Sequence, residues 1–80
     1  RRVLFRSVGV DVQPGTFRSA GAVDGDYCMW SRHSSLEGGP MDAIIASDGS
    51  YQGQMLVTIA ATDKVFRTHG CAPFQRVQAG

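Results

Sequence analysis

Hydrophobic and polar residues alternate along much of the chain with a period of two. The clearest example is the segment 54–60 (QMLVTIA), in which Met55, Val57 and Ile59 fall on one face. Successive side chains of a strand point to opposite faces, so this alternation predicts a half-buried strand. Apolar residues do not recur anywhere at helical spacing over three turns, which indicates a chain without long helices.

Shorter segments with strand character are separated by turn-forming residues. Val8, Val10 and Val12 predict a first strand, which the turn signal Pro14-Gly15 ends. Residues 48–53 (DGSYQG) predict a hairpin connection. Thr62-Asp63 predicts a turn, with a single helical turn over 62–65 as the alternative. We expect the other strands at residues 16–19, 27–33, 42–47, 64–68 and 74–77, with both faces covered at 43–46.

Ten glycines and many short strands predict an all-β fold, a small antiparallel sandwich or barrel. The expected boundaries are one β domain at residues 8–77 and a tail at residues 78–80. The side chains expected to form the core point inward from different strands: Phe17, Trp30, Val57, Ile59 and Phe66.

The two cysteines, Cys28 and Cys71, bear on stability and on cellular location. Eighty residues offer little core to offset the entropy of folding. An even pair of cysteines in such a chain indicates a disulfide formed in an oxidising compartment. Closing a loop of about 43 residues stabilises a domain by roughly 4 kcal/mol in the chain-entropy model. The alternative is two independent free thiols.

The first seven residues (RRVLFRS) suggest a different origin from the rest of the chain. They can be encoded by AGA CGT GTG CTC TTC CGA TCT, which resembles the 3′ part of a standard short-read sequencing adapter. We therefore expect residues 1–7 to be an adapter-derived, non-native segment, with a genuine basic arm as the alternative. Without its three arginines the chain keeps five basic and seven acidic residues, and the formal net charge changes from +1 to −2.

Charge and hydropathy give no support for nucleic-acid binding or for a membrane span. A net charge this small does not argue for nucleic-acid binding. There is no apolar run of 18 residues, so we expect no membrane span. The export signal that a disulfide-bearing domain needs is expected upstream of Val8.

The sequence shows no residue pattern typical of a catalytic, metal or cofactor site. His33 and His69 would need a third metal ligand such as Asp24 or Asp26, and nothing in their spacing favours one. We expect both histidines at surface or turn positions. The turn that contains the two aspartates lacks the later glutamate of a calcium loop. We therefore expect no enzyme activity, no metal and no cofactor.

Candidates for ligand binding remain among the residues outside the expected core. Tyr27 and Tyr51 can form a platform for a sugar or a peptide. Three arginines are expected to project from strands, where a solvated face is their ordinary role and ligand binding the alternative: Arg18, Arg32 and Arg67. The loops 22–26 and 47–53, or an open sheet edge that accepts an extended peptide, are further candidate surfaces.

Several stretches together resemble a small domain found in secreted proteins and lipoproteins of actinobacteria. They read DVQPGTFRSAG, YCMWSR, IIAS, LVTI and DKVFRTHGC, and the resemblance covers residue 8 to about residue 77. Met29 and Phe74 depart from the pattern, which has an aromatic residue at the first position and more often Trp at the second. The resemblance implies an extracytoplasmic module with a Cys28–Cys71 disulfide, and it implies no catalytic residues.

We therefore expect a non-catalytic binding or accessory module at the cell envelope, secreted or lipid-anchored. Its expected partner is a cell-wall polymer, a peptide or a protein. The alternatives are a purely structural spacer of a lipoprotein and a fragment of a small secreted enzyme.

Overall fold

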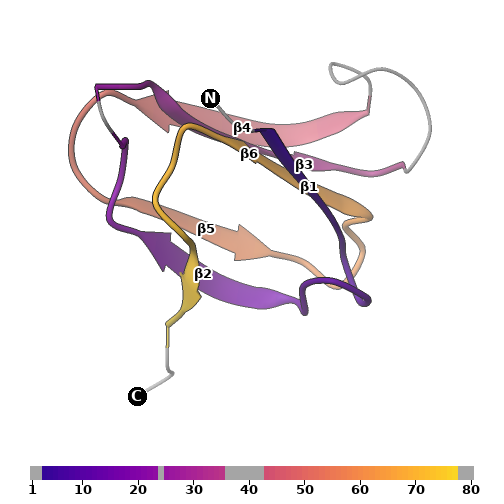
Figure 1. The fold of residues 1–80 in the computed structure, drawn as a ribbon. Helices are drawn as coiled ribbons and strands as arrows, with labels where there is room; N and C mark the ends of the chain where they lie inside the picture. The colour runs from indigo at the N-terminus through magenta and orange to yellow at the C-terminus, as the bar shows by residue number, and fades with distance from the viewer. Residues whose placement is uncertain (1–2, 24, 36–42, 78–80) are drawn as a thin grey trace.

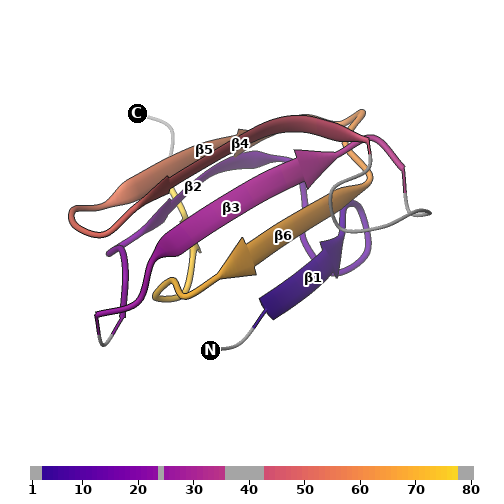
Figure 2. The same ribbon diagram turned by 90° about the horizontal axis from the view of Figure 1, so that it is seen from above.

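The computed structural model describes residues 3–23, 25–35 and 43–77, which form two antiparallel sheets packed face to face (Figures 1 and 2). A four-stranded sheet has the order β1-β6-β3-β4, and a three-stranded sheet has the order β5-β2-β7. The all-β prediction is confirmed. The described residues contain no helix, and hence none that would be long and apolar enough to cross a membrane. The strands are β1 Val3–Ser7, β2 Gly15–Ser19, β3 Cys28–His33, β4 Ile44–Ser50, β5 Met55–Ile59, β6 Val65–His69 and β7 Gln75–Arg76.

The core lies between the two sheets and consists of the inward residues of both. All five predicted core side chains are buried there, together with Met55 and the half-cystine Cys28. Strand β5 follows the predicted alternation, with Leu56 and Thr58 exposed on its outer face. Period-two patterning therefore places the core correctly, because burial of alternate side chains is the main gain from pairing these strands.

The disulfide between Cys28 and Cys71 is present and joins β3 to the segment that follows β6. The two Cα atoms lie 4.5 Å apart, although the residues are 43 positions apart in sequence. A bridge pairs Ala22 with Cys71, and the buried Ser19 hydroxyl donates to the carbonyl oxygen of Ala72 at 2.7 Å. The cystine and these hydrogen bonds therefore connect the end of β2 to the same corner of the sandwich.

The N-terminal segment differs from the expectation for residues 8–12. Residues 3–7 form β1, which pairs antiparallel with β6, and residues 8–12 form a tight turn rather than the predicted strand. Gly9 has φ of +89°, and the Ser7 carbonyl oxygen accepts three successive N–H groups, which end the extended chain. The pairing describes the conformation of residues 3–7 and leaves their origin open.

Two predictions about β4 and its neighbour are wrong. The strand lies at a sheet edge, and Ile45 is 45% exposed, so the apolar run is not covered on both faces. The segment after it is not a hairpin, because β4 and β5 belong to different sheets and the chain crosses between the layers (Figure 1). The alternative of a helical turn at 62–65 is also absent, since the Asp63 N–H closes a turn on the Ala60 carbonyl oxygen and Val65 already belongs to β6.

Removal of the disulfide tests its contribution to this frame. The double variant Cys28→Ala/Cys71→Ala should lose roughly 2–5 kcal/mol of unfolding free energy, because the unfolded chain regains the entropy of a long open loop. Urea denaturation monitored by Trp30 fluorescence measures the loss. Reducing agent should destabilise the unmodified protein to the same extent and leave the double variant unchanged. An unaltered urea midpoint on reduction would contradict the assignment.

Candidate functional site

Tyr27 and Tyr51, two residues predicted to bind a ligand, come together on the outer face of the four-stranded sheet. Cys28 pairs with Ser50 across β3 and β4, so the residues just outside this pair face each other. Their ring centroids lie 4.8 Å apart with planes tilted by 58°. Tyr27 is 41% exposed and Tyr51 is 70% exposed. The structure thus forms an exposed aromatic pair from two segments that are distant in sequence.

The surroundings of this tyrosine pair hold it in place. The Ser50 hydroxyl donates to the Gln52 carbonyl oxygen at 2.6 Å and accepts from the Gln52 N–H at 3.1 Å, which fixes the turn that carries Tyr51. The ring of Tyr27 lies so close to Gly49 that a Cβ there would overlap it. Gly70, with φ of +71°, approaches the backbone of Tyr27 equally closely. Glycine is therefore required at position 70, whereas a Cβ at position 49 would displace the Tyr27 ring.

The three candidate arginines do not gather into one site. Arg18 is exposed on β2 of the three-stranded sheet, whereas Arg67 lies on the four-stranded sheet with its guanidinium carbon 5.6 Å from the ring centroid of Phe5. Arg32 points inward and forms an ion pair with Asp63. The arginines therefore do not make a shared cationic surface.

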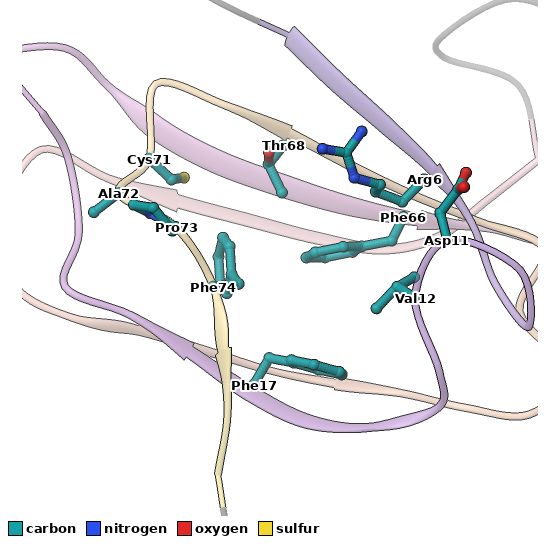
Figure 3. A pocket seen from close by; sticks show the side chains of 10 residues that line it. All are labelled: Arg6, Asp11, Val12, Phe17, Phe66, Thr68, Cys71, Ala72, Pro73 and Phe74. Atoms are coloured by element: carbon teal, nitrogen blue, oxygen red, sulfur yellow. The ribbon is translucent and has the colours of Figure 1, made fainter.

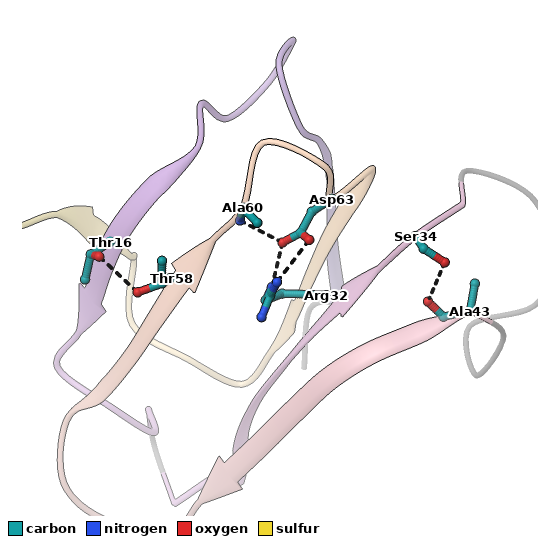
Figure 4. Close-up of polar contacts among 7 residues, drawn as sticks. All are labelled: Thr16, Arg32, Ser34, Ala43, Thr58, Ala60 and Asp63. Carbon is teal, nitrogen blue, oxygen red and sulfur yellow. Dashed lines mark hydrogen bonds and ion pairs between the residues drawn. The ribbon is translucent and has the colours of Figure 1, made fainter.

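The pair formed by Arg32 and Asp63 is the main polar contact of the interior (Figure 4). Arg32 donates from Nε and Nη2 to the two carboxylate oxygens at 2.6 and 3.0 Å, and the Ala60 N–H adds a third hydrogen bond at 3.0 Å. Side-chain exposure is 20% for Arg32 and 1% for Asp63. The Arg32 hydrogen bonds outweigh burial and lower the pKa of the Asp63 carboxyl below its ordinary value. This contact joins β3 to the turn between β5 and β6.

Sequence reasoning assigned Asp63 only to a turn and missed its role as a buried anion. The available signal was local, because an Asp three residues after the end of an apolar strand can accept from the backbone of that turn. Its partner lies 31 positions away, and no spacing in the sequence indicates that distance.

The histidines do not form a metal site in the described part of the chain, where no group of three potential ligands comes together. Asp24, one of the candidate ligands, lies outside the described residues. The expectation that both histidines occupy surface or turn positions is wrong for His33. It is buried in β3, and its Nε2 is 2.8 Å from the Ser31 hydroxyl oxygen.

A cavity of about 500 Å³ opens between the sheets, next to β1 and β7 (Figure 3). Phe66 and Phe74 meet edge to face in its wall at a centroid distance of 5.4 Å, and Phe17 faces them from the other sheet. Arg6 and Asp11 lie on one side of it. The described residues that line it are mostly apolar and include no nucleophile next to a base: Arg6, Asp11, Val12, Phe17, Phe66, Thr68, Cys71, Ala72, Pro73 and Phe74.

A family model described as the Rv1352-like extracellular domain matches residues 4–75, nearly all of the chain. The protein belongs to this family. Membership and the intramolecular disulfide together place the domain outside the cytoplasm, as the sequence predicted. The mycobacterial relatives described next confirm the predicted relation to actinobacterial proteins.

Curated mycobacterial proteins are among the relatives. The chain is 31% identical over 81 residues to "Uncharacterized protein Rv1352" of Mycobacterium tuberculosis and to "Uncharacterized protein Mb1387" of Mycobacterium bovis. The alignment covers 88% of this chain and 64% of each relative, so the chain spans slightly less than two thirds of their length. No solved structure gives a significant match.

The Arg32–Asp63 contact predicts a specific response to acid. Because folding lowers the pKa of Asp63, its stabilisation is complete above the unfolded-state value of about 4 and is lost as pH falls through the folded-state value. The variant Asp63→Asn should lose roughly 2–4 kcal/mol at pH 7, somewhat less than for a fully buried pair because Arg32 still reaches solvent. Urea unfolding at several pH values measures both effects.

Comparing the unmodified domain with Asp63→Asn distinguishes the pH dependence caused by Asp63 from that caused by other acidic groups. The stability difference between the unmodified domain and Asp63→Asn should be constant from pH 7 to about pH 5 and shrink in more acidic solution. If this difference in unfolding free energy stayed constant at every acidic pH at which the domain still folds, Asp63 would not be the group responsible for the pH dependence.

Proposed function

We propose that this extracellular domain is a non-catalytic binding module of the cell envelope, and that it binds a saccharide chain of the wall through Tyr27 and Tyr51. The carrying observation is that two exposed tyrosine rings, from separate segments, lie in contact on the outer face of the four-stranded sheet. The C–H face of a pyranose ring packs against the electron-rich face of an aromatic ring, and the phenol hydroxyls can bond the sugar hydroxyls.

The rigidity of the pair supports binding rather than a purely structural role. Tyrosine loses little conformational entropy when it contacts a ligand, and here Gly49 and the Ser50–Gln52 hydrogen bonds already restrict both residues. A cross-strand aromatic pair can also stabilise a sheet, typically by 0.2–1 kcal/mol. That role does not require Tyr51 to be as exposed as it is.

The non-catalytic part of the proposal rests on the polar groups of the described residues. The strongest charged contact, between Arg32 and Asp63, joins two interior elements and lies apart from both the cavity lining and the tyrosine pair. Near the tyrosines, the Ser50 hydroxyl is occupied by the backbone of Gln52. These contacts support a non-catalytic role, because they engage both groups in stabilising the fold.

Titration with soluble fragments of actinobacterial cell wall tests this function. Saturable amide shifts in two-dimensional NMR should cluster at residues 27, 29 and 49–52, on the face that carries the tyrosines. Tyr51→Ala should weaken binding at least tenfold, because one of the two stacking rings is lost. The Tm should change little, since the side chain is exposed.

Leu56→Ala is the matched control, because Leu56 is also an exposed large side chain but lies on β5 of the other sheet. It should bind as the unmodified domain does. If no amide resonance shifted at high fragment concentrations, the domain would instead be a purely structural spacer. If Tyr51→Ala and Leu56→Ala weakened fragment binding equally, the tyrosine pair would not be the binding site.

A further inference from the structure

The outer face of the four-stranded sheet carries a cation as well as the tyrosine pair. Strands β3 and β6 run side by side across this sheet (Figure 2), and their register places Arg67 of β6 opposite Ser31 of β3. The two neighbours of Arg67 in β6 are buried between the sheets, whereas Arg67 itself is partly exposed. Because side chains alternate along a strand, Arg67 projects from the same face as Tyr27 and Tyr51.

The Tyr27 ring and Arg67 are separated by a distance that suits an extended ligand. The Tyr27 ring lies against Gly49 of β4, and Gly49 pairs with Met29 of β3. Arg67 pairs with Ser31, two residues further along β3. Gly49 and Arg67 are thus about 7 Å apart along the strands and about 10 Å apart across them, from the usual spacings of a sheet. A chain of a few sugar residues can cover this separation.

Arg67 has no anionic partner in the described part of the chain. Its side chain forms no ion pair or hydrogen bond with any of the described residues, and its Nε is buried without an acceptor. Arg32 provides the contrast within the same sheet, because two of its nitrogen atoms donate to the carboxylate of Asp63. Arg67 therefore retains the capacity to bind an oxyanion that Arg32 has already used.

The environment of Arg67 favours such an interaction. Its guanidinium carbon lies 5.6 Å from the ring centroid of Phe5, a cation–π contact that restricts the side chain. A stacked guanidinium keeps the N–H groups in its own plane available for hydrogen bonds. Burial of Nε shows that the group has lost part of its hydration, and attraction between opposite charges grows as the surrounding dielectric constant falls.

We propose that Arg67 forms an oxyanion subsite and that the ligand is an acidic saccharide chain. A carboxylate or phosphate of this chain binds Arg67, while a neighbouring sugar ring packs on Tyr27 and Tyr51. The inference rests on the proposed saccharide binding and deepens it, since it specifies the charge of the ligand. The N–H groups of a guanidinium match the paired oxygens of both anions, whereas a neutral glycan would contact the tyrosines alone.

Separation of wall fragments by charge provides the probe. Soluble fragments of actinobacterial cell wall are divided by anion exchange into a neutral and an acidic pool of similar size, and each pool is titrated into the full chain. The acidic pool should bind at least about tenfold more tightly, the effect of one charge-assisted contact. It should shift the amide resonances of residues 67 and 69 in addition to those near the tyrosines, and the neutral pool should shift only the latter.

Substitution of Arg67 tests whether this residue causes the preference. Arg67→Gln should lower the affinity for the acidic pool to that for the neutral pool, and it should leave the affinity for the neutral pool unchanged. Arg67→Lys, which keeps the charge without the planar guanidinium, should retain part of the preference. Arg18→Gln is the matched control, because it removes the same charge from an exposed position of the other sheet. It should bind both pools as the unmodified domain does.

The failure of this subsite differs from the failure of the proposed function. Equal affinity of the unmodified domain for both pools, or equal losses from Arg67→Gln and Arg18→Gln, would overturn the subsite. Binding of both pools that still depends on Tyr51 would then leave the proposed function intact. If neither pool shifted any resonance, the proposed function would fail, and the subsite with it.

Chemical treatment of the acidic pool identifies the oxyanion. Conversion of its carboxylates to amides should abolish the preference if a carboxylate binds Arg67, and hydrolysis of its phosphate esters should abolish it if a phosphate does. A preference that survives both treatments together would contradict the proposal.

Discussion

The disulfide between Cys28 and Cys71 is the constraint on which the remaining structure depends. It joins the start of β3 to the segment after β6, and the bridge between Ala22 and Cys71 brings the end of β2 to the same corner. A chain of eighty residues buries few large side chains, so one covalent link across 43 positions accounts for a substantial part of its stability. The same link is compatible with the extracytoplasmic location of the domain.

The tyrosine pair and the inter-sheet cavity lie on opposite sides of this cystine. Tyr27 precedes Cys28 and faces outward, next to Tyr51, whereas Cys71 contributes to the wall of the inter-sheet cavity. The backbone that carries the tyrosine pair is thus anchored directly behind the exposed rings. A binding surface mounted on such a frame loses little entropy when it meets a ligand.

The fold was largely predictable because the alternation of apolar and polar residues directly indicates which side chains are buried. Met55, Val57 and Ile59 point inward in β5, and Phe17 and Phe66 do so in β2 and β6. Alternation fails where backbone geometry decides, as in the valine-rich residues 8–12, which Gly9 and the Ser7 carbonyl turn into a tight loop. It also fails for β4, since a run of apolar residues does not reveal whether its strand is central or at an edge.

The candidate site was only partly predictable for a related reason. Tyr27 and Tyr51 stand out as aromatic residues away from the core pattern, but only the register of β3 and β4 shows that they meet. The pairing of Arg32 with Asp63 depends on a contact between distant segments, whereas the sequence suggested a candidate ligand-binding arginine and a turn aspartate.

The most direct test of this account is whether the two tyrosines are in contact before any ligand arrives. Nuclear Overhauser effects between the ring protons of Tyr27 and Tyr51, measured in the oxidised domain alone, report this contact at the observed centroid distance of 4.8 Å. The account predicts clear inter-ring effects that weaken when the disulfide is reduced. Independent, rapidly averaging rings in the oxidised protein would contradict a pre-formed binding surface.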